Sequence, residues 1–207
     1  MLELGGNDPL IVPDDADLER AATLAVQGSY KCSGQRCRAV KRMLVQKRVA
    51  DEFADLVVEK TRAWPFGDPF DTCNQMGTVI DIAAAQLFEA RVNEAMANGA
   101  HLWIGNRRNG ALYSPTVLDG VDPSMTLVRE GTFGHVSPII ALDLLDDAIR
   151  ISNGTPFGLS SGVCTNRQDA ITRFINELRV GTVNVWEVPG YRIELTPFGG
   201  NKDSGLG

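Results

Sequence analysis

Short apolar runs alternate along this chain with amphipathic segments of helical length, and this alternation constrains the fold more than any other feature. Strands are predicted at 9–12, 42–46, 101–104, 138–142, 161–165 and 181–185, and helices at 18–27, 49–62, 82–98, 145–152 and 167–178. Such a pattern predicts an α/β fold with an open, mostly parallel twisted sheet flanked by helices. With no repeat or linker, residues 1–207 form one predicted domain.

Composition excludes several classes of function. The 207 residues are 43% hydrophobic and 22% charged, as in ordinary globular proteins, and the formal net charge is −6. A negative balance with one short basic cluster argues against binding nucleic acid. The sequence has no apolar run of the roughly 18 residues that cross a bilayer, and its first residues do not resemble a signal peptide. We therefore expect a cytoplasmic protein that binds neither nucleic acid nor membranes.

Cysteine spacing points to the chemistry of a single thiol. Cys32, Cys37, Cys73 and Cys164 are too sparse for a disulfide scaffold and form no zinc-binding pattern, so we expect no metal site. Cys37 ends the segment Ser33-Gly34-Gln35-Arg36-Cys37, a glycine-containing turn with several cations nearby, and cations favour the reactive thiolate. A small buried cysteine is the alternative, and the spacing alone leaves both interpretations open.

Several short motifs occur together in this chain. Leu2-Glu3-Leu4-Gly5-Gly6 precedes the Cys37 segment, Thr132-Phe133-Gly134 lies in the middle, and Pro197-Phe198-Gly199-Gly200 lies near the end, followed by Lys202, Ser204 and Gly205. In their order and relative placement these motifs resemble the catalytic domain of the aldehyde dehydrogenase superfamily. The resemblance covers essentially all 207 residues.

The resemblance implies a chemistry and a set of site residues. It makes Cys37 the nucleophile, Glu3 the general base and Phe133 the aromatic residue that packs against the nicotinamide of NAD or NADP. In the implied reaction, a thiolate attacks an aldehyde carbonyl, the hemithioacetal loses hydride to the nicotinamide, and a carboxylate activates water to release a carboxylic acid. The glycine-rich segment at Pro197 to Gly200 is assigned a structural role.

Arg36 suggests which aldehyde is bound. It lies directly before Cys37, as in family members that oxidise phosphorylated or phosphonylated aldehydes, where a guanidinium can bind the anionic group. Residues 181–192 also resemble those of phosphonoacetaldehyde dehydrogenases. The expected substrate is therefore a small aldehyde, phosphonylated if Arg36 binds it; a solvated surface arginine is the alternative.

The sequence also departs from the family. We expect it to lack the N-terminal dinucleotide-binding domain and the C-terminal oligomerisation segment, and therefore to be a truncated protein that is inactive alone. Gly131 replaces the usual glutamate, His135 a proline and Cys32 an asparagine. A separate polypeptide that supplies the nucleotide-binding half is one expected partner. The alternative is a non-catalytic interaction module that binds intact paralogues, and such a module should expose a large apolar patch.

Overall fold

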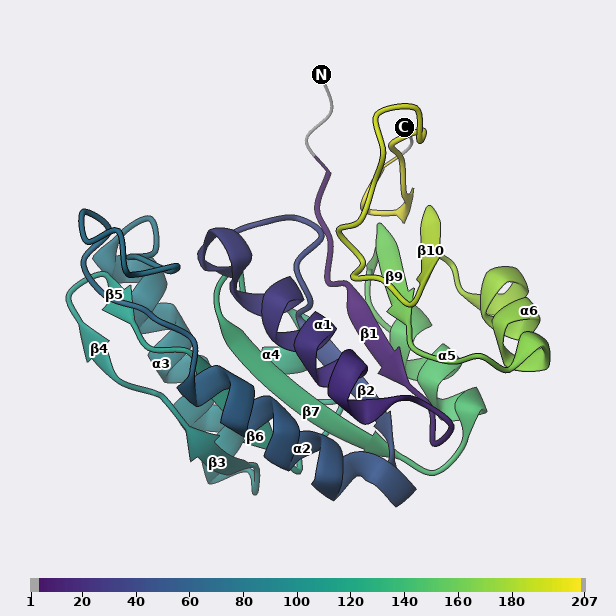
Figure 1. The fold of residues 1–207 in the computed structure, drawn as a ribbon, viewed down its shortest axis with the longest axis horizontal. Coiled ribbons are helices and arrows are strands. Elements are labelled where there is room, and N and C mark those ends of the chain that lie inside the picture. The colour runs from purple at the N-terminus through teal and green to yellow at the C-terminus, as the bar shows by residue number, and fades with distance from the viewer. Residues whose placement is uncertain (1–3, 206–207) are drawn as a thin grey trace.

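The computed structural model describes residues 4–205 (Figure 1). Glu3 lies outside the described residues. The helices and strands are, in chain order, β1 (Pro9–Val12), α1 (Leu18–Tyr30), the 3-10 helix η1 (Lys31–Gly34), β2 (Arg42–Gln46), α2 (Lys47–Arg62), α3 (Ile82–Ala97), β3 (His101–Ile104), β4 (Arg108–Asn109), β5 (Leu112–Tyr113), β6 (Thr116–Asp119), α4 (Thr126–Arg129), β7 (Val136–Leu142), α5 (Leu145–Asn153), β8 (Phe157–Gly158), β9 (Ser160–Val163), α6 (Gln168–Glu177), β10 (Thr182–Val185) and β11 (Asn201–Lys202).

A seven-stranded sheet organises the fold. Its strand order is β10-β9-β1-β2-β7-β6-β3, and every neighbouring pair is parallel except β3 with β6. The four residues of β1 are all buried, as expected for a strand near the middle of a sheet that is covered on both faces. The predicted α/β class and mostly parallel sheet are confirmed.

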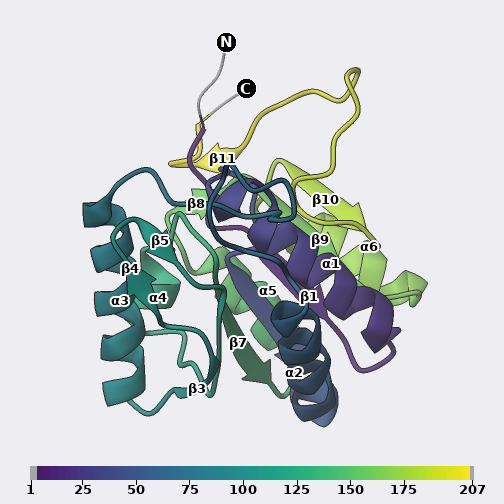
Figure 2. The ribbon, with the colours of Figure 1, turned by 60° about the vertical axis from the view of Figure 1, so that its left-hand side comes forward.

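Helices cover both faces of the sheet. Alternate residues of β1 belong to different cores: Leu10 and Val12 pack with α1 and α2, whereas Ile11 packs with α3, α5 and α6. Successive side chains of a strand point to opposite faces, so four residues contribute to two cores. Figures 1 and 2 show α1 and α2 on one side of the sheet and α5 on the other.

Some helices begin and end where the sequence predicts, and others do not. The carboxylates of Asp17 and Asp81 cap α1 and α3, accepting from backbone N–H groups of the first turn at 3.1 and 2.7 Å. Gly99 follows the predicted helix 82–98 with φ of 102°, a left-handed conformation typical of a glycine that ends a helix. The predicted end of the helix 18–27 is wrong, because α1 continues through Gly28 to Tyr30.

The segments that carry the predicted site residues all precede strands. They lead into β1, β2 and β7, so they meet at the amino ends of the parallel strands, at the top of Figure 1. Ligands of open α/β sheets more often lie outside the carboxyl ends of the strands.

Of the helices within residues 4–205, none has the length and hydropathy needed to cross a membrane.

Candidate functional site

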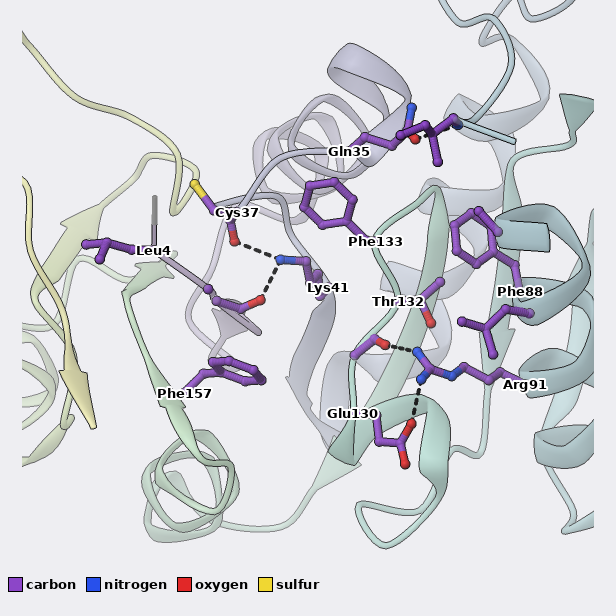
Figure 3. A pocket seen from close by; sticks show the side chains of 16 residues that line it. Leu4, Gln35, Cys37, Lys41, Phe88, Arg91, Glu130, Thr132, Phe133 and Phe157 are labelled. Atoms are coloured by element: carbon purple, nitrogen blue, oxygen red, sulfur yellow. Dashed lines mark hydrogen bonds and ion pairs between the residues drawn. The ribbon is translucent and has the colours of Figure 1, made fainter. Parts of the chain in front are cut away.

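A cavity of about 710 Å³ opens where these segments meet (Figure 3). Its wall is built by five parts of the chain that are distant in sequence: residues 4–6, the turn that precedes β2, residues 80–91, residues 130–133, and Phe157 of β8. The volume lies within the range of small-molecule sites. Side chains that line it include those of Cys37, Lys41, Phe88, Arg91, Phe133 and Phe157.

Cys37 lies on a tight turn at the edge of this cavity. The N–H of Ala39 donates to the carbonyl of Arg36 at 3.2 Å and closes the turn, which leaves Cys37 half-buried. Gly6 passes so close that a Cβ atom there would lie 2.6 Å from the carbonyl oxygen of Cys37. By contrast, Cys164 is buried, and burial raises the pKa of its thiol to about 12, so it is unsuited to thiolate chemistry.

Lys41 connects the Cys37 turn to the segment before β1. Its Nζ donates to the carbonyl oxygens of Cys37 and Gly6 at 2.7 and 2.6 Å, and it lies 5.6 Å from the centre of the Phe133 ring (Figure 3). The side chain is almost completely buried. Burial lowers the pKa of Lys41 to about 8, although the nearby Asp8 and Cys37 raise it.

More charged side chains lie under the turn. Arg42 is fully buried and donates to backbone carbonyls, two of its nitrogens reaching the carbonyl of Asn7 at 2.6 and 2.9 Å. Arg38 donates to Ser160 Oγ at 2.8 Å. Burial raises the pKa of Asp8 to about 7, and the neighbouring cations, Lys41 first among them, only partly reverse that effect. The basic cluster is therefore largely part of the core and not a solvated surface.

The cavity wall around Phe133 offers an exposed aromatic ring and an unpaired hydroxyl group. The Phe133 ring is 52% exposed and faces the cavity, so one side of it is free to pack against a flat ring. Beside it, the buried Oγ1 of Thr132 has no hydrogen-bond partner among residues 4–205. Buried polar atoms usually have partners, so an unpaired hydroxyl on a cavity wall fits a ligand that supplies one. These residues fit the nicotinamide end of the cofactor.

Glu130 does not take the place of the glutamate that Gly131 replaces. The carboxylate of Glu130 is paired with Arg91 at 2.5 Å, and Arg91 also donates to the carbonyl of Gly131. Gly131 itself has φ of +67°, a left-handed conformation that favours glycine. The family's carboxylate at this position therefore has no equivalent in this cavity wall.

A second cavity, of about 280 Å³, lies on the other side of the turn. Arg36 lines it together with Lys31, Arg192 and Glu187. One guanidinium nitrogen of Arg36 donates to the carbonyl of Gly28 at 2.9 Å, while its buried Nε has no partner among residues 4–205. Three cations and one carboxylate make this cavity suited to an anionic group. The consecutive residues Arg36 and Cys37 therefore line different cavities.

The structure brings together part of the predicted site. Cys37 and Phe133 line the first cavity, and Arg36 lines the second. Glu3 lies outside the described residues, although the residues that follow it, 4–6, line the first cavity. The sequence assigned no role to several side chains that complete the two cavities, namely Lys41, Phe88, Arg91, Thr132, Phe157 and Arg192. Thr132 and Arg192 lie within segments that the resemblance covers and Lys41 lies near Arg36 in a basic cluster, whereas no local signal pointed to Phe88, Arg91 and Phe157.

Comparisons with known proteins agree with this geometry. The family model described as "Aldehyde dehydrogenase family" matches residues 1–207. A sulfoacetaldehyde dehydrogenase of Neptuniibacter caesariensis is 40% identical over 207 residues, which are all of this chain and 45% of that protein.

Solved structures show the same similarity. Glyceraldehyde-3-phosphate dehydrogenase from Methanocaldococcus jannaschii, solved with NADP, is 37% identical with a TM-score of 0.95, over 100% of this chain and 45% of that one. Succinate-semialdehyde dehydrogenase from Burkholderia pseudomallei is 35% identical with a TM-score of 0.96, over 100% of this chain and 43% of that one. The chain thus spans less than half the length of these relatives.

Proposed function

Because this chain belongs to the aldehyde dehydrogenase family, we propose that it is the catalytic portion of an NAD(P)-dependent enzyme that oxidises a small anionic aldehyde to a carboxylic acid. The observation that carries the proposal is that Arg36 and Cys37, adjacent in the chain, line different cavities. The thiol therefore lies between two different cavities. The apolar cavity, with its exposed aromatic ring, can bind a cofactor, and the cationic cavity can bind a charged substrate.

In the proposed reaction the chain's own residues do most of the work. The thiolate of Cys37 attacks the carbonyl carbon of the aldehyde and forms a hemithioacetal. Its backbone N–H would donate to the oxygen that becomes negative. Glu3 is the proposed base that takes a proton from the water that hydrolyses the thioester. The nicotinamide cofactor, when bound, accepts the hydride. Phe133 would hold its ring, and Thr132 would donate to or accept from it.

The substrate proposal rests on charge. Arg36, Arg192 and Lys31 surround a cavity large enough for a phosphonate or sulfonate group. Three similar proteins are named for sulfoacetaldehyde, glyceraldehyde-3-phosphate and succinate semialdehyde, aldehydes that carry a sulfonate, a phosphate and a carboxylate. Phosphonoacetaldehyde, the aldehyde suggested by the sequence around Arg36, has the same architecture of a short aldehyde with an anionic end.

A nucleotide-binding part must cover the first cavity for this reaction. Exposed apolar side chains surround the cavity: Ile80 is 82% exposed, Leu87 47% and Phe133 52%. An exposed apolar patch of this kind is typical of a surface that packs against another domain. We propose that a dinucleotide-binding domain packs here, whether it belongs to the same polypeptide or to a separate one.

The same surface supports a second candidate function. A non-catalytic module that binds intact paralogues would use the apolar residues around the cavity and would not need the thiol of Cys37. The two functions differ in one variant, because Cys37→Ala abolishes aldehyde oxidation but leaves such binding unchanged.

The experiment measures aldehyde-dependent reduction of NAD and NADP by the purified protein, alone and co-expressed with the nucleotide-binding half of the sulfoacetaldehyde dehydrogenase relative. Activity with phosphonoacetaldehyde or sulfoacetaldehyde that is lost in Cys37→Ala supports the proposal. Arg36→Gln should raise KM for the anionic aldehydes at least about tenfold and leave KM for propanal unchanged, since a lost charge-assisted pair costs about 1.5–3 kcal/mol. Activity that persists in Cys37→Ala, or complete inactivity of the assembled pair, contradicts it.

A further inference from the structure

The ammonium group of Lys41 lies where three segments of the candidate site meet. We propose that Lys41 is a positioning residue that fastens the Cys37 turn to the segment before β1 and supplies the local positive charge that favours the Cys37 thiolate. The inference rests on the proposed function in one respect, namely that Cys37 is the nucleophile.

The contacts of Lys41 support a positioning role. Its Nζ donates at 2.6 Å to Gly6 and at 2.7 Å to Cys37, and both acceptors are main-chain carbonyls. Hydrogen bonds from a charged donor at these lengths are roughly twice as strong as neutral ones. They join two segments more than thirty residues apart in the chain. Lys41 therefore links the Cys37 turn to the residues that follow Glu3, beside the hydrogen bonds that Arg42 donates to Asn7.

The surroundings leave much of the Lys41 charge uncompensated. The ionisable groups that face it are Asp8 at the start of β1, Cys37 and Arg36 on the turn, and Arg42 at the start of β2. Asp8 is the only carboxylate of the group, and burial raises its pKa to about 7. Near neutral pH, Asp8 therefore carries only part of a negative charge. Cys37 is the other group near Lys41 that can carry a negative charge.

Lys41 also lies near the aromatic ring that lines the first cavity. The ring of Phe133 lies 5.6 Å from Nζ, a distance at which a cation is attracted to an aromatic face. Phe133 is the proposed nicotinamide contact, so Lys41 touches the cofactor wall, the nucleophile turn and the segment before β1 at once. Loss of the proton above about pH 8 removes the charge that acts on all three.

The experiment measures how fast iodoacetamide alkylates Cys37, followed by mass spectrometry of the Cys37 peptide. Wild type is compared with Lys41→Met, which keeps the length and loses the charge, and with Lys41→Arg, which keeps the charge. Lys202→Met is the matched control, since Lys202 Nζ also donates to two main-chain carbonyls, those of Asn153 and Thr155, but away from Cys37. The exposed Cys32 serves as an internal reference in each protein.

At pH 7 we expect Lys41→Met to alkylate Cys37 about tenfold more slowly than wild type, because the variant loses the positive charge beside the turn. Lys41→Arg should recover the rate to within about threefold, and Lys202→Met should match wild type. The proposal is overturned if Lys41→Met reacts at the wild-type rate, if Lys41→Arg is as slow as Lys41→Met, or if Lys202→Met is equally slow.

Lys41→Gln replaces Lys41→Met if the latter does not fold, because its amide keeps an N–H donor for the carbonyls of Gly6 and Cys37 but carries no charge. Lys41→Gln should alkylate Cys37 about tenfold more slowly than wild type, measured against Cys32 in the same protein. A folded Lys41→Gln that reacts at the wild-type rate overturns the proposal. No aldehyde or cofactor takes part, so a Lys41-dependent alkylation rate stands even if the protein oxidises no aldehyde.

Discussion

Arg91 holds the carboxylate of Glu130 in an ion pair of 2.5 Å on the wall of the first cavity. The next residue, Gly131, adopts φ of +67°, and its carbonyl also accepts from Arg91. The residue that stands where the family usually has glutamate thus adopts a backbone conformation that a residue with a side chain rarely adopts.

Gly131→Ala should lower the free energy of unfolding by about 2 kcal/mol. A left-handed conformation costs roughly 1–2 kcal/mol for a residue with a Cβ, and the new Cβ would lie 3.0 Å from the side chain of Asn7. Gly110→Ala is the control, because Gly110 has φ of +60° but no atom within 4 Å of the Cβ position. Urea unfolding measures both variants. Equal losses in the two would show that the contact with Asn7 is unimportant.

Cys32→Asn should raise the free energy of unfolding by about 0.5 kcal/mol. Cys32 is exposed and has φ of 56° and ψ of 37°, a region in which asparagine is several times more frequent than most residues. The substitution restores the residue that the family usually has. Cys73→Asn, at an exposed position without positive φ, should be neutral. A melting temperature that rises equally in both variants would point to the loss of a thiol and not to relief of strain.

Asp8→Asn should change how stability depends on pH. Burial raises the folded-state pKa of Asp8 from 3.8 to about 7, so the folded protein binds a proton that the unfolded chain has released. Ionisation of Asp8 therefore makes wild type less stable as the pH rises from about 4 to about 7. Relative to wild type, Asp8→Asn should gain stability across that window, by at most about 4 kcal/mol at about 1.4 kcal/mol per pKa unit.

Urea unfolding at several pH values checks the Asp8 prediction. The difference in unfolding free energy between variant and wild type should be constant below about pH 4 and above about pH 7. Ser160→Ala is the control variant. The backbone N–H of Ser160 donates to the Asp8 carboxyl group, and this substitution keeps that N–H. A difference that moves in favour of wild type as the pH rises would mean that the cations around Asp8 outweigh its burial.

The sheet could be predicted where apolar runs are long and bounded by turns, as for β1 and β2. The strand β6 was missed, because only Val117 and Leu118 of Thr116–Asp119 are apolar, although β6 lies inside the sheet between β7 and β3. Gly28 was misinterpreted for a different reason. A Cβ there would lie 2.5 Å from the Val40 side chain, so the glycine allows close packing of α1 and does not end the helix.

The sequence predicted those site residues that lie within short, recognisable motifs. Cys37 and Phe133 each lie within a short recognisable segment, and the structure places both on one cavity wall. Lys41 and Arg42 are adjacent cations in the sequence, and residues of these types are usually exposed. In the structure their exposed fractions are 4% and 1%. Their burial depends on which backbone carbonyls the fold brings within reach. That information lies in tertiary packing and not in local composition.

The assignment of Cys37 as the nucleophile is tested most directly by the order in which the cysteines accept an acetyl group from p-nitrophenyl acetate. Cys32 and Cys73 are exposed, Cys37 is half-buried and Cys164 is buried. If Cys37 is the nucleophile, peptide mass spectrometry should find it acetylated first and then deacetylated, ahead of both exposed cysteines. Acetylation that follows exposure, with Cys32 and Cys73 modified before Cys37, would contradict the assignment of Cys37 as the nucleophile.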